Sequence, residues 1–142
     1  MKSILISIRP EWTAKILNGE KDIEIRKTAP KCDLPVDVYI YCTKGDYIGC
    51  ISNKYVGKVV AKFTLRCYAR SHETLVEIVK SHRKMAVEGA LLSVEQIKEY
   101  AKGKDFYFWA IDDLQIFDQP KPLSEFGLKR APQSWQYVEE EE

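Results

Sequence analysis

The chain has 142 residues, of which 45% are hydrophobic and 30% are charged, and its formal net charge is +1. This size and balance are typical of one globular domain and exclude a chain that is disordered throughout. They also exclude a membrane-spanning helix, because no stretch approaches the ~18 uninterrupted apolar residues that crossing requires. We expect a single domain over residues 1–138, an acidic tail over residues 139–142 and, since no targeting signal is evident, a cytoplasmic protein.

The first half of the chain predicts strands around one short helix. Residues 4–8 are nearly all apolar and favour a buried strand. Pro10 suits the first position of a helix and Gly19 suits the position after its end, so we expect a helix over residues 10–18. Three further strands are expected over residues 22–26, 36–42 and 56–69.

The second half begins with helical patterns. Ser71 is a candidate cap for one helix, and Ser93 with Gln96 fits the capping box of another, which Gly103 ends. Beyond them we expect a strand over residues 105–117, stopped by Pro120 and Pro122, and a turn and short strand within residues 123–138.

This order of elements favours an α+β fold. Strands and helices do not alternate regularly, as they would in a doubly wound parallel sheet. A mixed sheet of about 5–6 strands, curled toward a barrel and flanked by short helices, would protect its edges.

Cysteine and histidine spacing argues against a metal site. The chain has no C-x-x-C pair, and its two histidines lack a third candidate ligand nearby. We therefore expect free thiols, no metal and no cofactor.

Charge is distributed unevenly. Residues 1–70 carry 13 basic and 7 acidic side chains, whereas residues 71–142 carry 9 and 14. A basic half suits a partner that bears phosphates, although an ordinary solvated surface also explains it.

Residues 19–26 carry the clearest chemical pattern. Lys21 lies where the expected helix gives way to a strand, and Glu24 and Arg26 share one face of that strand. If this face lines a cleft, the three side chains can hold a polar ligand, and a desolvated lysine can act as a base or nucleophile. The alternative is a solvent-facing strand whose charges interact by only about 0–1 kcal/mol.

The pattern G-x-K-x-x-E-x-R, filled by Gly19, Lys21, Glu24 and Arg26, resembles the signature of the ASCH domain. Similarity to bacterial and phage-borne ASCH proteins extends over most of the chain, at residues 15–21, 38–43, 57–60, 120–126 and 130–135. The resemblance implies a PUA-like, barrel-like core with a cleft beside the first helix, lined by the signature residues.

For function, the resemblance implies binding of RNA or a modified nucleoside in that cleft. Some small ASCH proteins are amidohydrolases that remove the acetyl group of N4-acetylcytidine, and they are similar to this chain at Lys21. In such an enzyme the catalytic residues would be Lys21, Glu24 and Glu88. Those enzymes have threonine as the presumed nucleophile where this chain has Glu24, a carboxylate suited to positioning water as a general base. A metal-independent ribonuclease would use the same residues.

A single-stranded nucleic acid also needs cations and stacking surfaces. We expect Trp12 to anchor the first helix in the core and Trp135 either to plug the barrel end or to rim the cleft. A binding module is favoured, with an enzyme second and a protein-interaction module that uses the aromatic C-terminal residues third. The ligand-binding candidates are Lys21, Glu24, Arg26, Lys27, Arg9, Lys44 and Trp135.

Overall fold

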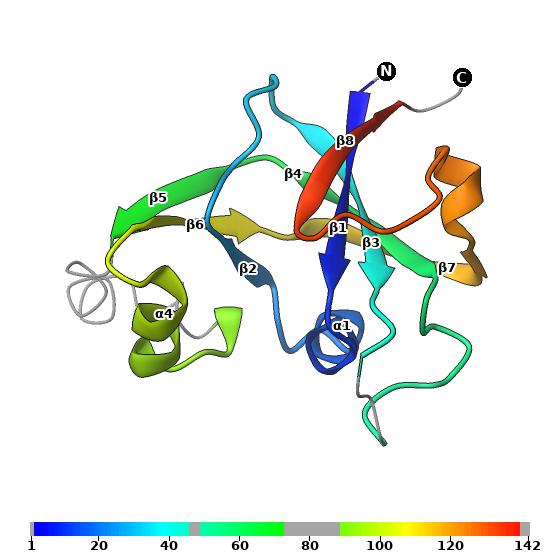
Figure 1. The fold of residues 1–142 in the computed structure, drawn as a ribbon, viewed down its shortest axis with the longest axis horizontal. Helices are drawn as coiled ribbons and strands as arrows, with labels where there is room; N and C mark the ends of the chain where they lie inside the picture. Colours follow the sequence, from blue (N-terminus) through cyan, green and yellow to red (C-terminus); the bar gives the residue numbers. More distant parts are fainter. Residues whose placement is uncertain (1, 46–48, 73–88, 140–142) are drawn as a thin grey trace.

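The computed structural model describes residues 2–45, 49–72 and 89–139, and their strands form two sheets (Figure 1). In chain order the strands are β1 (Lys2–Ile8), β2 (Ile23–Arg26), β3 (Val36–Cys42), β4 (Val59–Leu65), β5 (Tyr68–His72), β6 (Asp105–Ala110), β7 (Asp112–Lys121) and β8 (Trp135–Glu139). The helices are α1 (Pro10–Leu17) and α4 (Val94–Ala101), with a 3-10 turn, η2 (Leu123–Phe126). In these residues no helix is long and apolar enough to span a membrane.

The larger sheet has the strand order β7-β4-β3-β1-β8. Strand β1 runs parallel to β3 and antiparallel to β8, with Ser7 opposite Tyr41 and Ile6 opposite Trp135. Parallel strands end at the same edge of a sheet, and Figure 1 shows the arrowheads of β1 and β3 pointing together toward α1. Residues that follow these two strands are therefore brought side by side.

Both faces of the larger sheet are covered, which explains why every residue of β1 after Lys2 is buried. On one face Ile4, Ile6 and Ile8 are fully buried in a core that includes Ile16 of α1. On the other face Tyr39 packs against Phe126 of η2, with ring centroids 4.8 Å apart. Burying an aliphatic or aromatic side chain contributes about 1.5–3 kcal/mol, so this central strand is a major source of stability.

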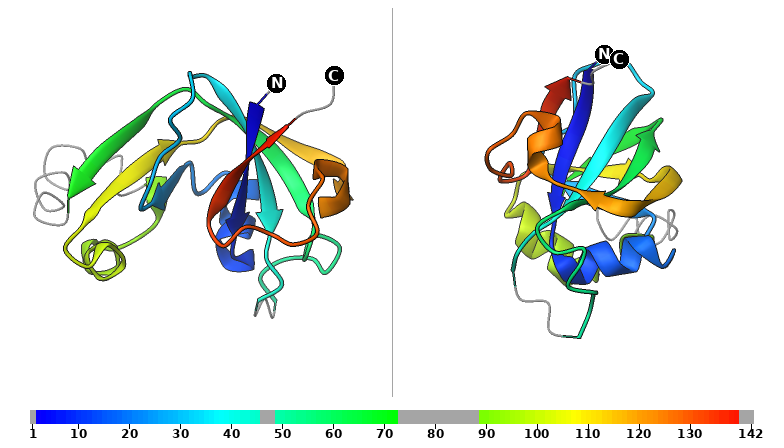
Figure 2. Two further views of the ribbon diagram at one scale, coloured as in Figure 1. Left: turned by 45° about the horizontal axis from the view of Figure 1, so that its top comes forward. Right: turned by 90° about the vertical axis from the view of Figure 1, so that its right-hand side faces the viewer.

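The smaller sheet has the order β2-β6-β5 and is covered by α4. Ile25 and Phe106 pack there against Ile97 of the helix. The predicted capping box is confirmed, since Ser93 Oγ accepts from the Gln96 N–H at 3.1 Å and Gln96 Oε1 accepts from the Ser93 N–H at 2.9 Å. Figure 2 shows α4 against one end of this sheet, away from η2.

The α+β class is confirmed, and eight strands in two sheets replace the mixed sheet of five or six expected from the sequence. The expected strand over residues 56–69 divides into β4 and β5, and the one over residues 105–117 divides into β6 and β7. In each case the chain leaves one sheet and joins the other (Figure 2). Apolar alternation continues through both strands of each pair, so periodicity alone cannot show the change of sheet.

Three local expectations are corrected. Ser71 lies in β5 opposite Phe106 and does not cap a helix; the helix expected to follow it falls outside the described residues. Pro120 does not end its strand, because β7 is an edge strand in which a missing N–H is tolerated. Glu139, expected in the acidic tail, is the last residue of β8.

All four cysteines are free thiols, as their spacing predicted. Cys42 is buried at the end of β3, whereas Cys50 and Cys67 are exposed.

Candidate functional site

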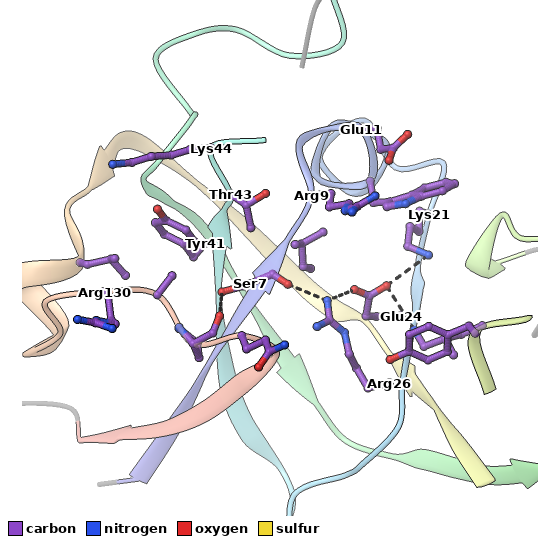
Figure 3. Close-up of a pocket in the computed structure, with 18 of the residues that line it drawn as sticks. Ser7, Arg9, Glu11, Lys21, Glu24, Arg26, Tyr41, Thr43, Lys44 and Arg130 are labelled. Atoms are coloured by element: carbon purple, nitrogen blue, oxygen red, sulfur yellow. Dashed lines mark hydrogen bonds and ion pairs between the residues drawn. The ribbon is translucent and has the colours of Figure 1, made fainter. Parts of the chain in front are cut away.

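A cavity of about 1030 Å³ lies where the carboxyl ends of β1 and β3 approach β2 (Figure 3). Its walls come from these strands, from α1 and α4, and from residues 129–133, which precede β8. Its volume is at the upper end of the ~300–1,000 Å³ that is typical of small-molecule sites.

The side chains of Lys21, Glu24 and Arg26 form a buried ionic cluster on one side of this cavity. Glu24 Oε2 accepts from Arg26 Nη2 at 2.7 Å, and Glu24 Oε1 lies 3.5 Å from Lys21 Nζ. The side chains of Lys21, Glu24 and Arg26 are 1%, 9% and 13% exposed. The structure therefore contradicts the alternative of a solvent-facing strand.

Lys21 is held by contacts on several sides. Its Nζ donates to the Ala90 carbonyl at 2.5 Å and lies 5.2 Å from the centroid of the Trp12 ring. Burial lowers the pKa of Lys21, and the nearby Glu24 carboxylate opposes part of that shift. The lowered pKa favours the neutral amine, the form that can accept a proton or attack an electrophile.

Arg26 connects β2 to the larger sheet. Its Nη2 donates to the Ser7 carbonyl at 2.8 Å, and its Nη1 donates to Ser134 Oγ at 3.1 Å. Ser7 in turn donates from Oγ to the Pro132 carbonyl at 2.7 Å and from its N–H to the Ser134 carbonyl at 2.9 Å. These bonds fix residues 129–134, the segment that precedes β8, against the end of β1.

The opposite side of the cavity carries Tyr41, Thr43, Lys44 and Arg130, which Figure 3 shows across Ser7 from the ionic cluster. Tyr41 is the penultimate residue of β3, and Thr43 directly follows the strand. The Thr43 N–H donates to the Ile8 carbonyl at 3.0 Å, which keeps the ends of β3 and β1 together.

Among the described residues that line the cavity, basic side chains outnumber acidic ones. The basic lining residues are Arg9, Lys21, Arg26, Lys44, Lys129 and Arg130, and the acidic ones are Glu11 and Glu24. Arg9, Lys44, Lys129 and Arg130 form no ion pair with any residue that the structure describes.

Five of the predicted ligand-binding residues line the cavity: Lys21, Glu24, Arg26, Arg9 and Lys44. Lys27 does not line it, and its Nζ lies 5.0 Å from the centroid of the Tyr100 ring. The catalytic candidate Glu88 falls outside the described residues.

Trp135 is not among the cavity's lining residues and packs beside it. Its ring centroid lies 5.6 Å from that of Trp109 and 5.3 Å from that of Tyr137. Its Nε1 donates to Thr28 Oγ1 at 2.9 Å. The aromatic C-terminal residues thus have partners within the fold.

Trp12 packs against the core, as expected, and also lines the cavity. Sequence reasoning missed several other lining residues. Gln96 and Tyr100 were detectable, because residues four apart share one face of a helix. Tyr41 was not detectable from the sequence. Its position at the cavity depends on the parallel pairing that sets it opposite Ser7, and such pairing between distant strands leaves no local sequence pattern.

The fold is similar to that of solved ASCH proteins. The ASCH protein from Zymomonas mobilis has a TM-score of 0.71 and 21% identity, over 96% of this chain and 87% of that one. A point mutant of that protein has a TM-score of 0.71 and 21% identity, over 98% of this chain and 91% of that one. The N-terminal domain of Staphylothermus marinus McrB has a TM-score of 0.51 and 12% identity, over 86% of this chain and 77% of that one. No family model and no curated protein matches the sequence.

Proposed function

We propose that this chain, which has the fold of an ASCH domain, binds RNA or a modified nucleoside in the cavity lined by Lys21, Glu24 and Arg26. The observation that carries the proposal is the composition of the cavity wall. Six basic side chains against two acidic ones are combined there with the rings of Trp12, Tyr41 and Tyr100.

This combination matches what a nucleotide needs. Basic side chains attract phosphates, and aromatic rings can stack on bases for about 1–3 kcal/mol each. The ionic cluster adds hydrogen-bonding groups in fixed positions, because Glu24 and Arg26 are already held by neighbouring strands. Fixed polar groups that face an aromatic site can recognise the edge of a base without a cost of reorganisation.

The binding test is a fluorescence-anisotropy titration of a labelled single-stranded RNA at increasing salt. We expect affinity to fall with salt, and Arg9→Ala to weaken binding and to reduce the slope of the salt dependence by about 1. Arg70→Ala is the matched control, because Arg70 is an exposed arginine outside the cavity. Absence of RNA binding at low salt would contradict the RNA part of the proposal, and equal weakening by both variants would place RNA binding outside the cavity.

The state of Lys21 favours a second candidate function, hydrolysis of an acylated nucleoside. A buried lysine with a lowered pKa, beside a carboxylate, is a plausible base or activator of a nucleophile. Water would add across the amide of N4-acetylcytidine to give cytidine and acetate. Lys21 would take the proton, Glu24 or Glu88 would act as the acid–base partner, and Arg26 would stabilise the oxyanion.

Chromatography of N4-acetylcytidine incubated with the protein tests this candidate. Cytidine release that disappears in Lys21→Met, with an unchanged circular dichroism spectrum, would support hydrolysis and show that Glu24 can serve where related enzymes have threonine. A parallel incubation with labelled RNA in a metal chelator tests the metal-independent ribonuclease. If the folded wild-type protein turns over neither substrate, the enzyme candidate is wrong and the binding proposal stands on its own test.

A further inference from the structure

We propose that the cavity takes a phosphorylated ligand in one orientation, with the base against the ionic cluster of Lys21, Glu24 and Arg26 and the phosphate against Lys44 and Arg130. This inference rests on the proposed function and deepens it, because it selects a nucleotide or a strand of RNA over a free nucleoside. It follows from a difference between the two sides of the cavity, which Figure 3 shows separated by Ser7.

On the first side the charges of Lys21, Glu24 and Arg26 are already occupied by one another, and Arg9 at the rim is the one cation there without an ion pair among the described residues. Both oxygens of Glu24 face cations, and both terminal nitrogens of Arg26 donate to protein oxygens. Lys21 donates to a carbonyl and lies against Trp12. A phosphate here would have to compete with Glu24 at short range, whereas a neutral, polar base would only add hydrogen bonds to groups that are in place.

On the second side the positive charge is uncompensated. Lys44 and Arg130 are exposed and form no ion pair within the described part of the chain. Tyr41 and Thr43 bring hydroxyl groups to the same side (Figure 3). Guanidinium, ammonium and hydroxyl donors without a competing carboxylate are the groups that bind phosphate oxygens in proteins.

The second side is also built to hold its donors in place. The backbone carrying Arg130 belongs to the segment that Ser7 anchors through the Pro132 and Ser134 carbonyls. The stem of Lys44 lies over Gly57, where an added Cβ would come within 3.0 Å of Lys44 Cε. Burial raises the pKa of Tyr41, so its phenol keeps the proton that it would donate.

The two sides together imply that a phosphate increases affinity. A charge-assisted hydrogen bond contributes about 1.5–3 kcal/mol, and about 1.4 kcal/mol is a tenfold change in affinity. We therefore expect a nucleoside 5′-monophosphate to bind at least about tenfold more tightly than the matching nucleoside.

Isothermal titration calorimetry with adenosine, cytidine, guanosine and uridine and their 5′-monophosphates tests the orientation. In the double variant Lys44→Ala/Arg130→Ala, the affinity for the monophosphate is expected to fall at least about tenfold more than the affinity for the nucleoside. The matched control is Arg70→Ala/Lys31→Ala, which removes two exposed cations outside the cavity.

The outcomes separate this inference from the proposed function. If nucleoside and monophosphate bind equally, or if the double variant binds the monophosphate as tightly as the wild type does, the orientation is wrong while nucleoside binding stands. If the protein binds RNA but no mononucleotide, the assignment of a single nucleotide to the cavity is also wrong. If neither RNA nor any of the eight compounds binds, the proposed function itself fails.

Discussion

Glu24 and Arg26 form a 2.7 Å ion pair on β2 in which the side chains are only 9% and 13% exposed. A pair so far removed from water is costly to form and more costly to break, because one charge then remains buried without its partner. The same carboxylate also lies 3.5 Å from the still more deeply buried Lys21. The cluster that we assign to ligand binding is therefore also part of what fixes the fold.

Loss of the Glu24 carboxylate should destabilise the protein strongly. Glu24→Ala leaves two buried cations facing each other, and we expect it to lower the free energy of unfolding by about 3–5 kcal/mol. Urea denaturation measures this change. Glu20→Ala is the control, because its partner Lys15 is 45% exposed and such pairs contribute at most about 1 kcal/mol. Equal losses in the two variants would show that the cluster is solvated.

Burial of Lys21 predicts a dependence of stability on pH. Its pKa in the folded protein lies below its value in the unfolded chain, so the unfolded chain binds more protons between those two values. Stability therefore rises with pH through this window, toward the ordinary lysine pKa of about 10.4. We expect the free energy of unfolding of the wild type, minus that of Lys21→Met, to increase as the pH rises toward the ordinary lysine pKa.

Subtracting the free energy of unfolding of Lys21→Met from that of the wild type separates the effect of Lys21 from that of two tyrosines, whose titration changes stability with pH in the opposite direction. Burial raises the pKa values of Tyr41 and Tyr100, so their contribution to stability is lost as pH rises through the ordinary tyrosine range. Both tyrosines are present in wild type and variant, and their contributions cancel in the subtraction. A difference that stays constant with pH would mean that Lys21 keeps an ordinary pKa.

A side chain at Gly57 should weaken ligand binding, because it would displace the neighbouring Lys44 side chain. Gly57→Ala is strained because φ is +74°, and its Cβ would also meet Lys44 Cε at 3.0 Å. Gly49→Ala is the matched control, because φ is +75° there and an added Cβ meets nothing within 4 Å. We expect each variant to lose about 1–2 kcal/mol of stability, and only Gly57→Ala to weaken nucleotide binding in the calorimetric assay. Equal affinities in the two variants would separate Lys44 from the site.

Two serines on β1, Ser7 and Ser3, differ in whether their hydroxyl groups are hydrogen-bonded, and the stabilities of their alanine variants can be compared directly. Ser7 Oγ donates to the Pro132 carbonyl at 2.7 Å, whereas Ser3 Oγ is buried with no hydrogen-bond partner among the described residues. Ser7→Ala should lower the free energy of unfolding by about 1 kcal/mol, and Ser3→Ala should leave it unchanged or raise it. Thermal denaturation of both variants measures the contrast. A greater loss for Ser3→Ala would contradict this account of the strand.

The sequence was most informative where a feature depends on a few neighbouring residues. Pro10 and Gly19 predicted α1, and Ser93 with Gln96 predicted the start of α4. The alternation in β2 correctly placed Glu24 and Arg26 on one face. Each of these depends on geometry within one or two turns or a single strand.

Features that depend on pairing between distant segments were not predictable in the same way. The sheet to which β5 belongs is decided by its pairing with β6, which the alternation within β5 does not reveal. The side of the cavity that carries Tyr41 and Arg130 is built from β3 and from the segment before β8, which lie far apart in the sequence. Whether Glu24 faces Lys21 or Arg26 also required coordinates, and the answer is that its two oxygens serve both.

The pairing of β1 with β8 has a consequence for synthesis on the ribosome. Lys2 lies opposite Glu139, and Figure 2 shows β8 alongside β1. One flank of β1 therefore stays open in the nascent chain until residues 135–139 have emerged. Open edges of apolar strands readily pair with other chains. A message truncated ahead of β8 would therefore leave this flank of β1 open and yield an aggregation-prone product.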